Sequence, residues 1–265
     1  MNIDYSNIKK DKYTVQGLTI IDNMFFISAY KKNDYSRLYV YNEKHYLGKI
    51  ILENKYHVGG LSFDQKNNII FVTGSAKSIS SYNYLKIKKL IKNNFTININ
   101  DNKHIIISNN LKTPFRAASL FVYKGFIYIT KFDLKTRFAK IKYKYIKGTI
   151  VEKNIVDLGI IDDSFCVQGL CFYKNNLYLS SSLGTVKSVI SIYDKNLKLI
   201  NRRMIKQLGM EGIIIKKNNL YSVYEMGKQK ISIHSLINLN RFKTKILFLK
   251  LKYYLTYKAY KIIKK

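Results

Sequence analysis

Short runs of Tyr, Ile, Phe and Val recur along the chain, separated by Asn, Gly, Lys or Asp. This pattern is typical of strands and turns rather than of long helices, whose apolar positions repeat every 3.6 residues. One phrase occurs five times, as "VQGLTII", "VGGLSF", "AASLFVY", "VQGLCFY" and "MEGIIIK". Equivalent positions in these copies are 43, 59, 50 and 43 residues apart, and hold Leu18, Leu61, Leu120, Leu170 and Ile213. Such spacings fit four-stranded propeller blades.

The repeats predict an all-β fold, a five-bladed β-propeller of four-stranded antiparallel blades in a single domain. In the first repeat, strands are expected over residues 13–21, 24–30, 37–41 and 49–52. The expected blades are 13–53, 56–108, 115–158, 165–207 and 209–251. Residues 252–265 are expected to form a basic C-terminal tail.

Two segments depart from the repeat. In "NYLKIKKLIKNNFTININDNKHIIISNN", an insertion at the blade edge, a short helix is expected to turn Ile87, Leu90 and Ile91 inward before a strand at 105–107. No long helix is expected outside residues 84–105. The last segment, "RFKTKILFLKLKYYLTYKAYKIIKK", begins with a run suited to the outer strand of the fifth blade. A basic tail that binds a surface is the alternative for its end.

A small residue occupies the same position of each first strand: Gly17, Gly60, Ser119, Gly169 and Gly212. First strands crowd the propeller axis, so small residues let the backbones approach closely. The residue before the small position is polar in three repeats, as Gln16, Gln168 and Glu211. Packing at the axis does not require this polarity, so these side chains are candidates for a binding site.

The first two strands of each blade form an antiparallel hairpin, so the start of the first lies beside the end of the second. This predicts three pairs, Gln16 with Tyr30, Gln168 with Ser182, and Glu211 with Glu225, with Ser75 and Phe132 at the corresponding ends of the other two blades. His57 and Arg116 lie near two first-strand starts and add an imidazole and a guanidinium. The predicted ligand-binding residues, gathered at one mouth of the central channel, are Gln16, Tyr30, His57, Arg116, Gln168, Ser182, Glu211 and Glu225.

The chain is strongly basic, with 47 Lys and Arg against 16 Asp and Glu and a net charge of +31. This charge favours non-specific attraction to polyanions such as nucleic acid. AT-rich coding is a competing explanation, because only six of the 47 basic residues are Arg. Cys166 and Cys171 lie on opposite faces of one predicted strand, so no disulfide is expected. Without a signal-peptide run or a transmembrane segment, we expect a cytoplasmic monomer.

The "QGL" and "GGL" starts, and above all "MEGIIIKKNNLYSVYE", resemble the blade consensus of bacterial propellers related to the gluconolactonase, strictosidine-synthase and phytase-like groups. In that consensus a blade opens with Glu-Gly-Ile and its second strand ends in Glu, as Glu211 and Glu225 do here. The resemblance covers the repeat pattern over most of the chain. It implies, for hydrolytic members, a metal, commonly calcium, held at the channel mouth by Glu, Asp and Asn. Those relatives usually have six blades.

Two functions follow from these residues. The first is a non-catalytic propeller that binds a small polar ligand, a glycan or a protein segment at the channel mouth, with no cofactor. The second is a metal-assisted hydrolase of a lactone, ester or phosphoester. It would use Glu211 and Glu225 as calcium ligands or acid/base groups and His57 as a proton shuttle. Phosphate loops, HExxH and GxSxG motifs do not occur in the sequence.

Overall fold

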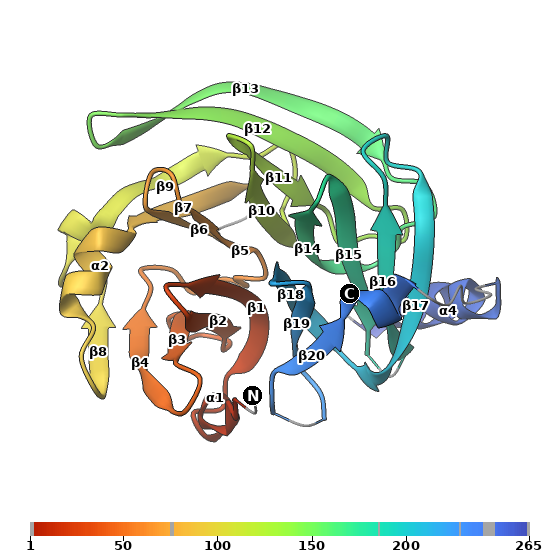
Figure 1. Cartoon of the computed structure of the whole chain (residues 1–265), viewed down its shortest axis with the longest axis horizontal. Coiled ribbons are helices and arrows are strands. Elements are labelled where there is room, and N and C mark those ends of the chain that lie inside the picture. The colour runs from red at the N-terminus through yellow and green to blue at the C-terminus, as the bar shows by residue number, and fades with distance from the viewer. Residues whose placement is uncertain (1–2, 75–76, 185, 228, 241–246, 264–265) are drawn as a thin grey trace.

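Five β-sheets are arranged in a ring in the computed structural model, which describes residues 3–74, 77–184, 186–227, 229–240 and 247–263 (Figure 1). The sheets have three to five strands and are mainly antiparallel, which confirms the predicted all-β, five-bladed propeller. In the first blade, the observed strands closely match those predicted. No described helix is long and apolar enough to cross a membrane.

Within each blade the strands follow chain order from the axis to the rim. Blade 1 contains β1 (Thr14–Ile21), β2 (Met24–Tyr30), β3 (Arg37–Tyr41) and β4 (Tyr46–Ile51). Blade 2 contains β5 (Leu61–Asp64), β6 (Ile69–Thr73), β7 (Ser78–Asn83) and β9 (Ile106–Lys112). Blade 3 contains β10 (Ser119–Tyr123), β11 (Phe126–Thr130), β12 (Arg137–Ile146) and β13 (Thr149–Ile160). Blade 4 contains β14 (Val167–Tyr173), β15 (Asn176–Leu183), β16 (Val186–Tyr193) and β17 (Leu199–Leu208). Blade 5 contains β18 (Met210–Lys216), β19 (Asn219–Tyr224) and β20 (Ser232–Ser235).

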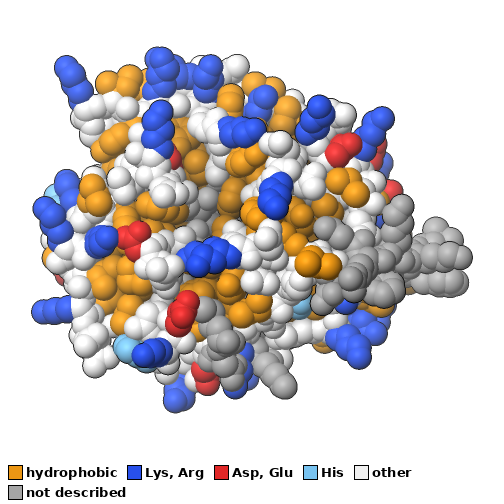
Figure 2. Space-filling view, in the orientation of Figure 1, with side chains coloured by type: hydrophobic (Ala, Val, Ile, Leu, Met, Phe, Trp, Pro, Cys, Tyr) orange, Lys and Arg blue, Asp and Glu red, His pale blue; other side chains and the backbone are white. Residues whose placement is uncertain are grey.

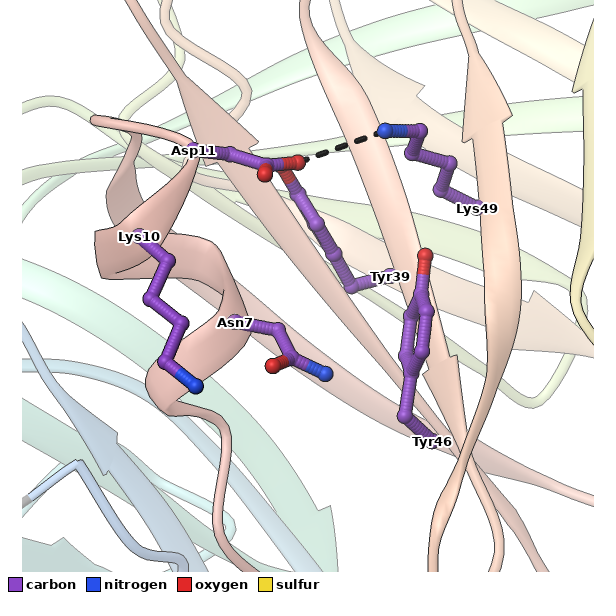
Figure 3. Close-up of a pocket in the computed structure, with 6 residues that line it drawn as sticks. All are labelled: Asn7, Lys10, Asp11, Tyr39, Tyr46 and Lys49. Atoms are coloured by element: carbon purple, nitrogen blue, oxygen red, sulfur yellow. Dashed lines mark hydrogen bonds and ion pairs between the residues drawn. The ribbon is translucent and has the colours of Figure 1, made fainter.

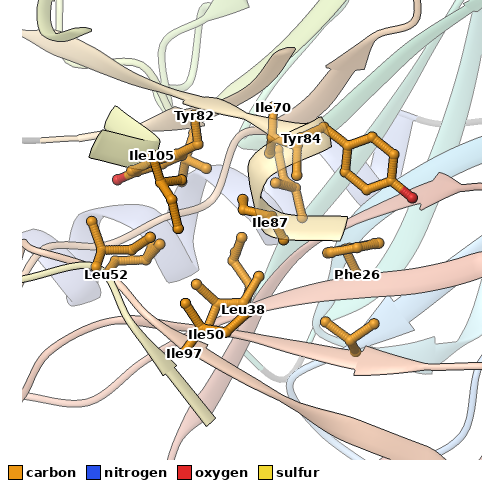
Figure 4. Close-up of a cluster of buried hydrophobic side chains, with 14 of the residues drawn as sticks. Phe26, Leu38, Ile50, Leu52, Ile70, Tyr82, Tyr84, Ile87, Ile97 and Ile105 are labelled. Atoms are coloured by element: carbon orange, nitrogen blue, oxygen red, sulfur yellow. The ribbon is translucent and has the colours of Figure 1, made fainter. Parts of the chain in front are cut away.

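The insertion joins blades 1 and 2. It forms α2 (Tyr84–Leu90), then β8 (Phe95–Asn98) and a short 3-10 helix (Lys103–Ile105). β8 lies within the residues predicted for blade 2, yet it extends the sheet of blade 1 by pairing in parallel with β4. Ile87 is buried as predicted, whereas Leu90 is exposed, because only one face of this short helix meets the core. Figure 4 shows Ile87 among buried side chains of both blades.

The C-terminal segment contradicts two predictions. After the short helix α3 (Leu236–Asn240), residues 247–263 form a 17-residue helix, α4 (Leu247–Ile263), and not an outer strand of blade 5. The expectation of no long helix outside residues 84–105 is wrong for the same reason, because α4 also includes most of the predicted basic tail, residues 252–265. The run over residues 241–246 falls outside the described residues. Burial follows the helical period: Tyr253 and Tyr257 are buried one turn apart, whereas Leu255 between them is 58% exposed. A strand would place all three on one face.

The first strands of neighbouring blades pack directly against one another around the axis. At Gly212 of β18, an added Cβ atom would lie 2.4 Å from the backbone nitrogen of Leu18 in β1. At Gly17 of β1, it would lie 2.6 Å from the carbonyl oxygen of Gly59, which precedes β5. Both distances are far inside van der Waals contact, so the small residues are required for this approach, as predicted.

The N-terminal segment closes the ring against blade 5. The Tyr5 backbone N–H donates to the carbonyl oxygen of Gln229, and the Ile231 N–H donates to that of Ile3. The buried Tyr5 hydroxyl donates to the Tyr224 carbonyl at 3.2 Å and accepts from the Tyr224 N–H at 2.9 Å. One hydroxyl therefore satisfies two backbone groups of β19, and it links the first residues of the chain to the last blade.

We predict that Gly212→Ala destabilises the protein by about 3 kcal/mol, because backbone atoms surround the new methyl group and cannot move away. The free energy of unfolding in urea measures this. Gly125→Ala is the control: its φ of +77° is unfavourable for alanine, but no atom lies within 4 Å of its Cβ position. We expect it to cost only about 1 kcal/mol. Equal losses in the two variants would contradict the close packing at the axis.

Tyr5→Phe is expected to cost about 2 kcal/mol of unfolding free energy, since the ring keeps its packing while two buried backbone groups lose their partner. Tyr35→Phe is the matched control, because the Tyr35 side chain is exposed. Urea denaturation of both variants checks the difference. A Tyr5→Phe variant as stable as the wild type would show that this hydroxyl does not hold the ring closed.

Candidate functional site at the channel mouth

The predicted site residues lie where the first strands begin and the second strands end, at one face of the ring. The pairing there differs from the prediction, because β-bulges interrupt β1, β14 and β18. Tyr30 pairs with Thr14 and not with Gln16. The backbone N–H groups of Ser182 and Glu225 instead donate to the carbonyls of Cys166 and Gly209. A bulge inserts one unpaired residue and re-aims its side chain, and in β1 and β14 the skipped residues are Gln16 and Gln168.

Gln16, His57 and Tyr30 form one contact group across blades 1 and 2. The Gln16 side-chain oxygen lies 3.0 Å from His57 Nδ1, and the Gln16 amide nitrogen donates to the Val15 carbonyl at 3.0 Å. The amide oxygen can only accept, so this bond places a proton on His57 Nδ1. The His57 and Tyr30 rings stack with their centroids 4.0 Å apart. Gln16 is buried and His57 exposed, so the imidazole forms an aromatic wall at the solvent edge.

Glu211 is the most unusual residue of the mouth, because it carries a carboxyl although the residue is only 3% exposed. Its hydrogen bond is from the Gln168 side-chain nitrogen, which donates to Glu211 Oε1 at 3.4 Å. Burial raises the pKa of Glu211 well above its usual range, and the neighbouring charge of Glu225 raises it further. Burial also raises the pKa of Glu225, which is less deeply buried than Glu211. Among the residues that the structure describes, neither carboxyl forms an ion pair.

Within the described chain, three other predicted residues do not join this pair of carboxyls. Arg116 is exposed and has no hydrogen bond or ion pair with the mouth residues in the described chain. Ser182 is buried in its blade. Phe132 packs against Tyr257 of α4, with ring centroids 6.1 Å apart. Ser75 lies outside the described residues.

The sequence did not predict that α4 would cover part of this face. The Tyr253 hydroxyl donates to the carbonyls of Ser181 and Lys187, at 3.0 and 2.9 Å, and the Tyr257 hydroxyl donates to Asp133. The helix thus lies against β15 and β16 of blade 4, at the periphery of the ring in Figure 1. Cys166 is buried beneath it, and burial raises its pKa to about 12. The spacing of Tyr253 and Tyr257, four residues or about one helical turn apart, was the feature of the sequence that could have predicted this helix.

A cavity of about 280 Å³ lies away from the mouth, between α1 (Ser6–Lys10) and the outer strands of blade 1 (Figure 3). Asp11 accepts hydrogen bonds there from Tyr39 at 2.8 Å and from Lys49 at 3.3 Å. Burial alone would raise the pKa of Asp11, but Tyr39 and the charges of Lys49 and Arg37 lower it. The carboxylate is thus paired with two cations, and it fastens the end of α1 to blade 1.

No model of a known protein family matches the chain, and no curated protein matches it. Among solved structures, the chain is similar to the computationally designed Ika8 protein, with a TM-score of 0.41 and 14% identity over 84% of this chain and 58% of that one. The designed Ika4 protein gives a TM-score of 0.39 and 14% identity, and the match covers 71% of this chain and 96% of that one. A chain of the mitotic checkpoint complex gives a TM-score of 0.42 and 10% identity, and the match covers 85% of this chain and 62% of that one. The chain thus spans less than two thirds of the first and third of these chains. The fold assignment rests on the strand pairing.

Because the pKa of Glu211 is raised on folding, the folded state holds its proton more tightly than the unfolded state. Stability is therefore expected to fall as the pH rises above the unfolded pKa of about 4.3. Glu211→Gln removes this loss, so the variant should be more stable than the wild type at pH 8 and equal to it at pH 4. Urea denaturation at both values measures this, with the exposed Glu43→Gln as control. A less stable variant at pH 8 would mean that the ionised carboxylate is compensated.

Proposed function

We propose that the protein is a non-catalytic propeller that binds a small polar ligand at the channel mouth, and that the ligand carries a cationic amino group. The observation that carries this proposal is the buried carboxyl of Glu211 beside Glu225, with an amide but no cation paired to it in the described chain. Burial of a charge is costly unless the charge is paired. An ammonium group would supply the missing partner.

The rest of the mouth supports polar recognition. Gln168 offers an amide next to the carboxyls, and the stacked His57 and Tyr30 rings offer a flat wall across the opening. Binding sites of this kind combine apolar or aromatic walls with a few polar groups that fix the orientation of the ligand. A glycan or a protein segment that presents an amino group would meet the same chemistry.

The alternative is a metal-assisted hydrolase, as in the gluconolactonase-like propellers that the sequence resembles. Glu211 and Glu225 would then be calcium ligands or acid/base groups, with His57 as proton shuttle. Calcium takes six to eight oxygen ligands, and no group of three or more His, Cys, Asp or Glu in the described chain could hold a metal ion. Two carboxyls and a neighbouring amide supply fewer oxygen ligands than calcium takes, so binding is the better supported function.

We expect glucosamine to bind more tightly at pH 7 than at pH 5, and more tightly than neutral glucose, its matched partner in a panel of amines. The amino group of glucosamine is still mostly protonated at pH 7. Rising pH ionises the carboxyls, which attract the ammonium. Glu211→Gln and Glu225→Gln are each expected to weaken binding about tenfold, or about 1.4 kcal/mol. Isothermal titration calorimetry measures both effects, and Glu43→Gln serves as the control.

Two results would overturn the proposal. If neutral and amine members of the panel bind equally, the carboxyl pair does not select a cation. If the purified protein contains stoichiometric calcium and hydrolyses a lactone or phosphoester panel in a chelator-sensitive way, the hydrolase is correct. Glu211→Gln and Glu225→Gln should then each abolish metal uptake and turnover.

A further inference from the structure

The face opposite the mouth is built from the turns between first and second strands, and these turns repeat a lysine. In blades 3, 4 and 5 the loop has two residues, and its first residue is a lysine with a φ near +48°. Such loops favour Asn, Asp or Gly, so backbone preference does not explain lysine there. Blade 2 adds a lysine in a longer turn. The exposed turn lysines are Lys66, Lys124, Lys174 and Lys217.

The acidic side chains of these turns are already engaged in contacts within the protein. Asp22 of the blade 1 turn pairs with Lys88 at 2.6 Å and accepts from Tyr84 at 3.0 Å. Asp64, at the end of β5, is buried and accepts from the Tyr143 hydroxyl and the Asn67 amide, both at 2.6 Å. The turns between first and second strands therefore present lysines to solvent, while their two carboxylates are engaged within the protein. The whole chain, at +31, adds to this positive potential, and Figure 2 shows basic side chains well in excess of acidic ones on the visible face.

A groove of about 880 Å³ opens among these turns, between blades 2 and 3. Its walls combine aromatic rings and lysines, including Phe63, Tyr123, Tyr145, Phe172, Lys66 and Lys124. The Tyr123 and Phe172 rings stack with centroids 4.7 Å apart and planes 5° from parallel. The Lys124 ammonium lies 5.2 Å from the centre of the Tyr123 ring and 3.0 Å from the Asn175 side-chain oxygen. Flat rings and positive charge are thus held next to each other by contacts between blades.

We propose that this groove and the surrounding turn lysines bind single-stranded nucleic acid. Bases stack on aromatic side chains without regard to sequence, while lysines contact the phosphates of the backbone. The groove offers rings for the first contact, and the turn lysines of blades 2 to 4 continue the positive surface on either side of it. This site is independent of the mouth, because hairpin turns and strand starts lie at opposite ends of each blade.

The test uses the full-length protein and a fluorescein-labelled oligothymidylate of about 20 nucleotides, with binding followed by fluorescence anisotropy between 50 and 200 mM salt. The triple variant Lys66→Gln/Lys124→Gln/Lys174→Gln is expected to weaken binding at least about tenfold and to reduce the salt slope by about 2, since each single-strand phosphate contact contributes about 0.7. Circular dichroism verifies that the fold is retained.

The matched control removes the same charge from the mouth side, as Lys32→Gln/Lys55→Gln/Lys135→Gln. All three lysines are exposed. Lys32 follows β2, Lys55 follows β4 and Lys135 follows β11, and these strands end at the mouth side. We expect less than about a threefold loss from this variant, because it changes only the diffuse field. Equal losses in the two triple variants would overturn the proposal, since the attraction would then depend on net charge alone.

A second pair of variants tests the aromatic part of the groove. Tyr123→Leu keeps an apolar side chain but removes the ring, and it should weaken oligonucleotide binding about tenfold. Tyr123→Phe keeps the ring and should bind like the wild type. Unchanged binding by Tyr123→Leu, or equal binding of a duplex of the same length, would overturn base stacking in the groove.

Free thymidine monophosphate distinguishes a strand from a single nucleotide as the ligand, because both carry a base and a phosphate. We expect the mononucleotide to compete only at concentrations at least about a hundredfold above those of the oligonucleotide, because it engages one lysine and one ring. Competition at equal concentrations would replace the strand by a nucleotide as the ligand of the groove.

Discussion

The close approach of five first strands at the axis is the constraint on which the rest of this structure depends. Gly212 and Gly17 lie so near the backbones of the next blades that a methyl group does not fit. This close approach excludes any side chain larger than that of glycine at these two positions. Once the ring is closed, every first strand runs in the same direction along the axis. All strand starts therefore meet at one face, and all hairpin turns meet at the other.

The two faces carry opposite chemistry as a result. At the mouth, β-bulges interrupt the strand pairing of β1, β14 and β18 and re-aim the side chains at the interruptions. Glu211 becomes a buried carboxyl by this route, with Gln168 of the adjacent blade as its hydrogen-bond partner. At the other face, two-residue turns expose lysine, and contacts between blades hold aromatic rings beside it. The mouth is suited to a cation and the turn face to a polyanion.

The high net charge gains a structural meaning from this separation. A charge of +31 would by itself repel the amino ligand proposed for the mouth. Burial offsets this repulsion, because the Glu211 carboxyl sits behind the wall of the mouth, where the surrounding protein screens it less from a bound cation than water would. The exposed turn lysines instead act on large anions, for which many weak contacts add up. The two proposed sites thus use the same charge distribution differently.

The sequence by itself determined the strand pattern, the five repeats, the small residues at the axis and the polar side chains before them, because alternation and spacing are local properties. Only the tertiary structure decided the register at the mouth: a bulge moved Tyr30 opposite Thr14, and local pattern does not specify one extra residue in a pair. It also decided that β8 joins blade 1 and that α4 is a helix. The order of apolar and polar residues in these two segments is compatible with more than one structure. Packing against another blade therefore decided where β8 pairs and that the last segment is a helix. The turn-face groove has the same origin, since its rings come from three blades that are separated by whole repeats in the sequence.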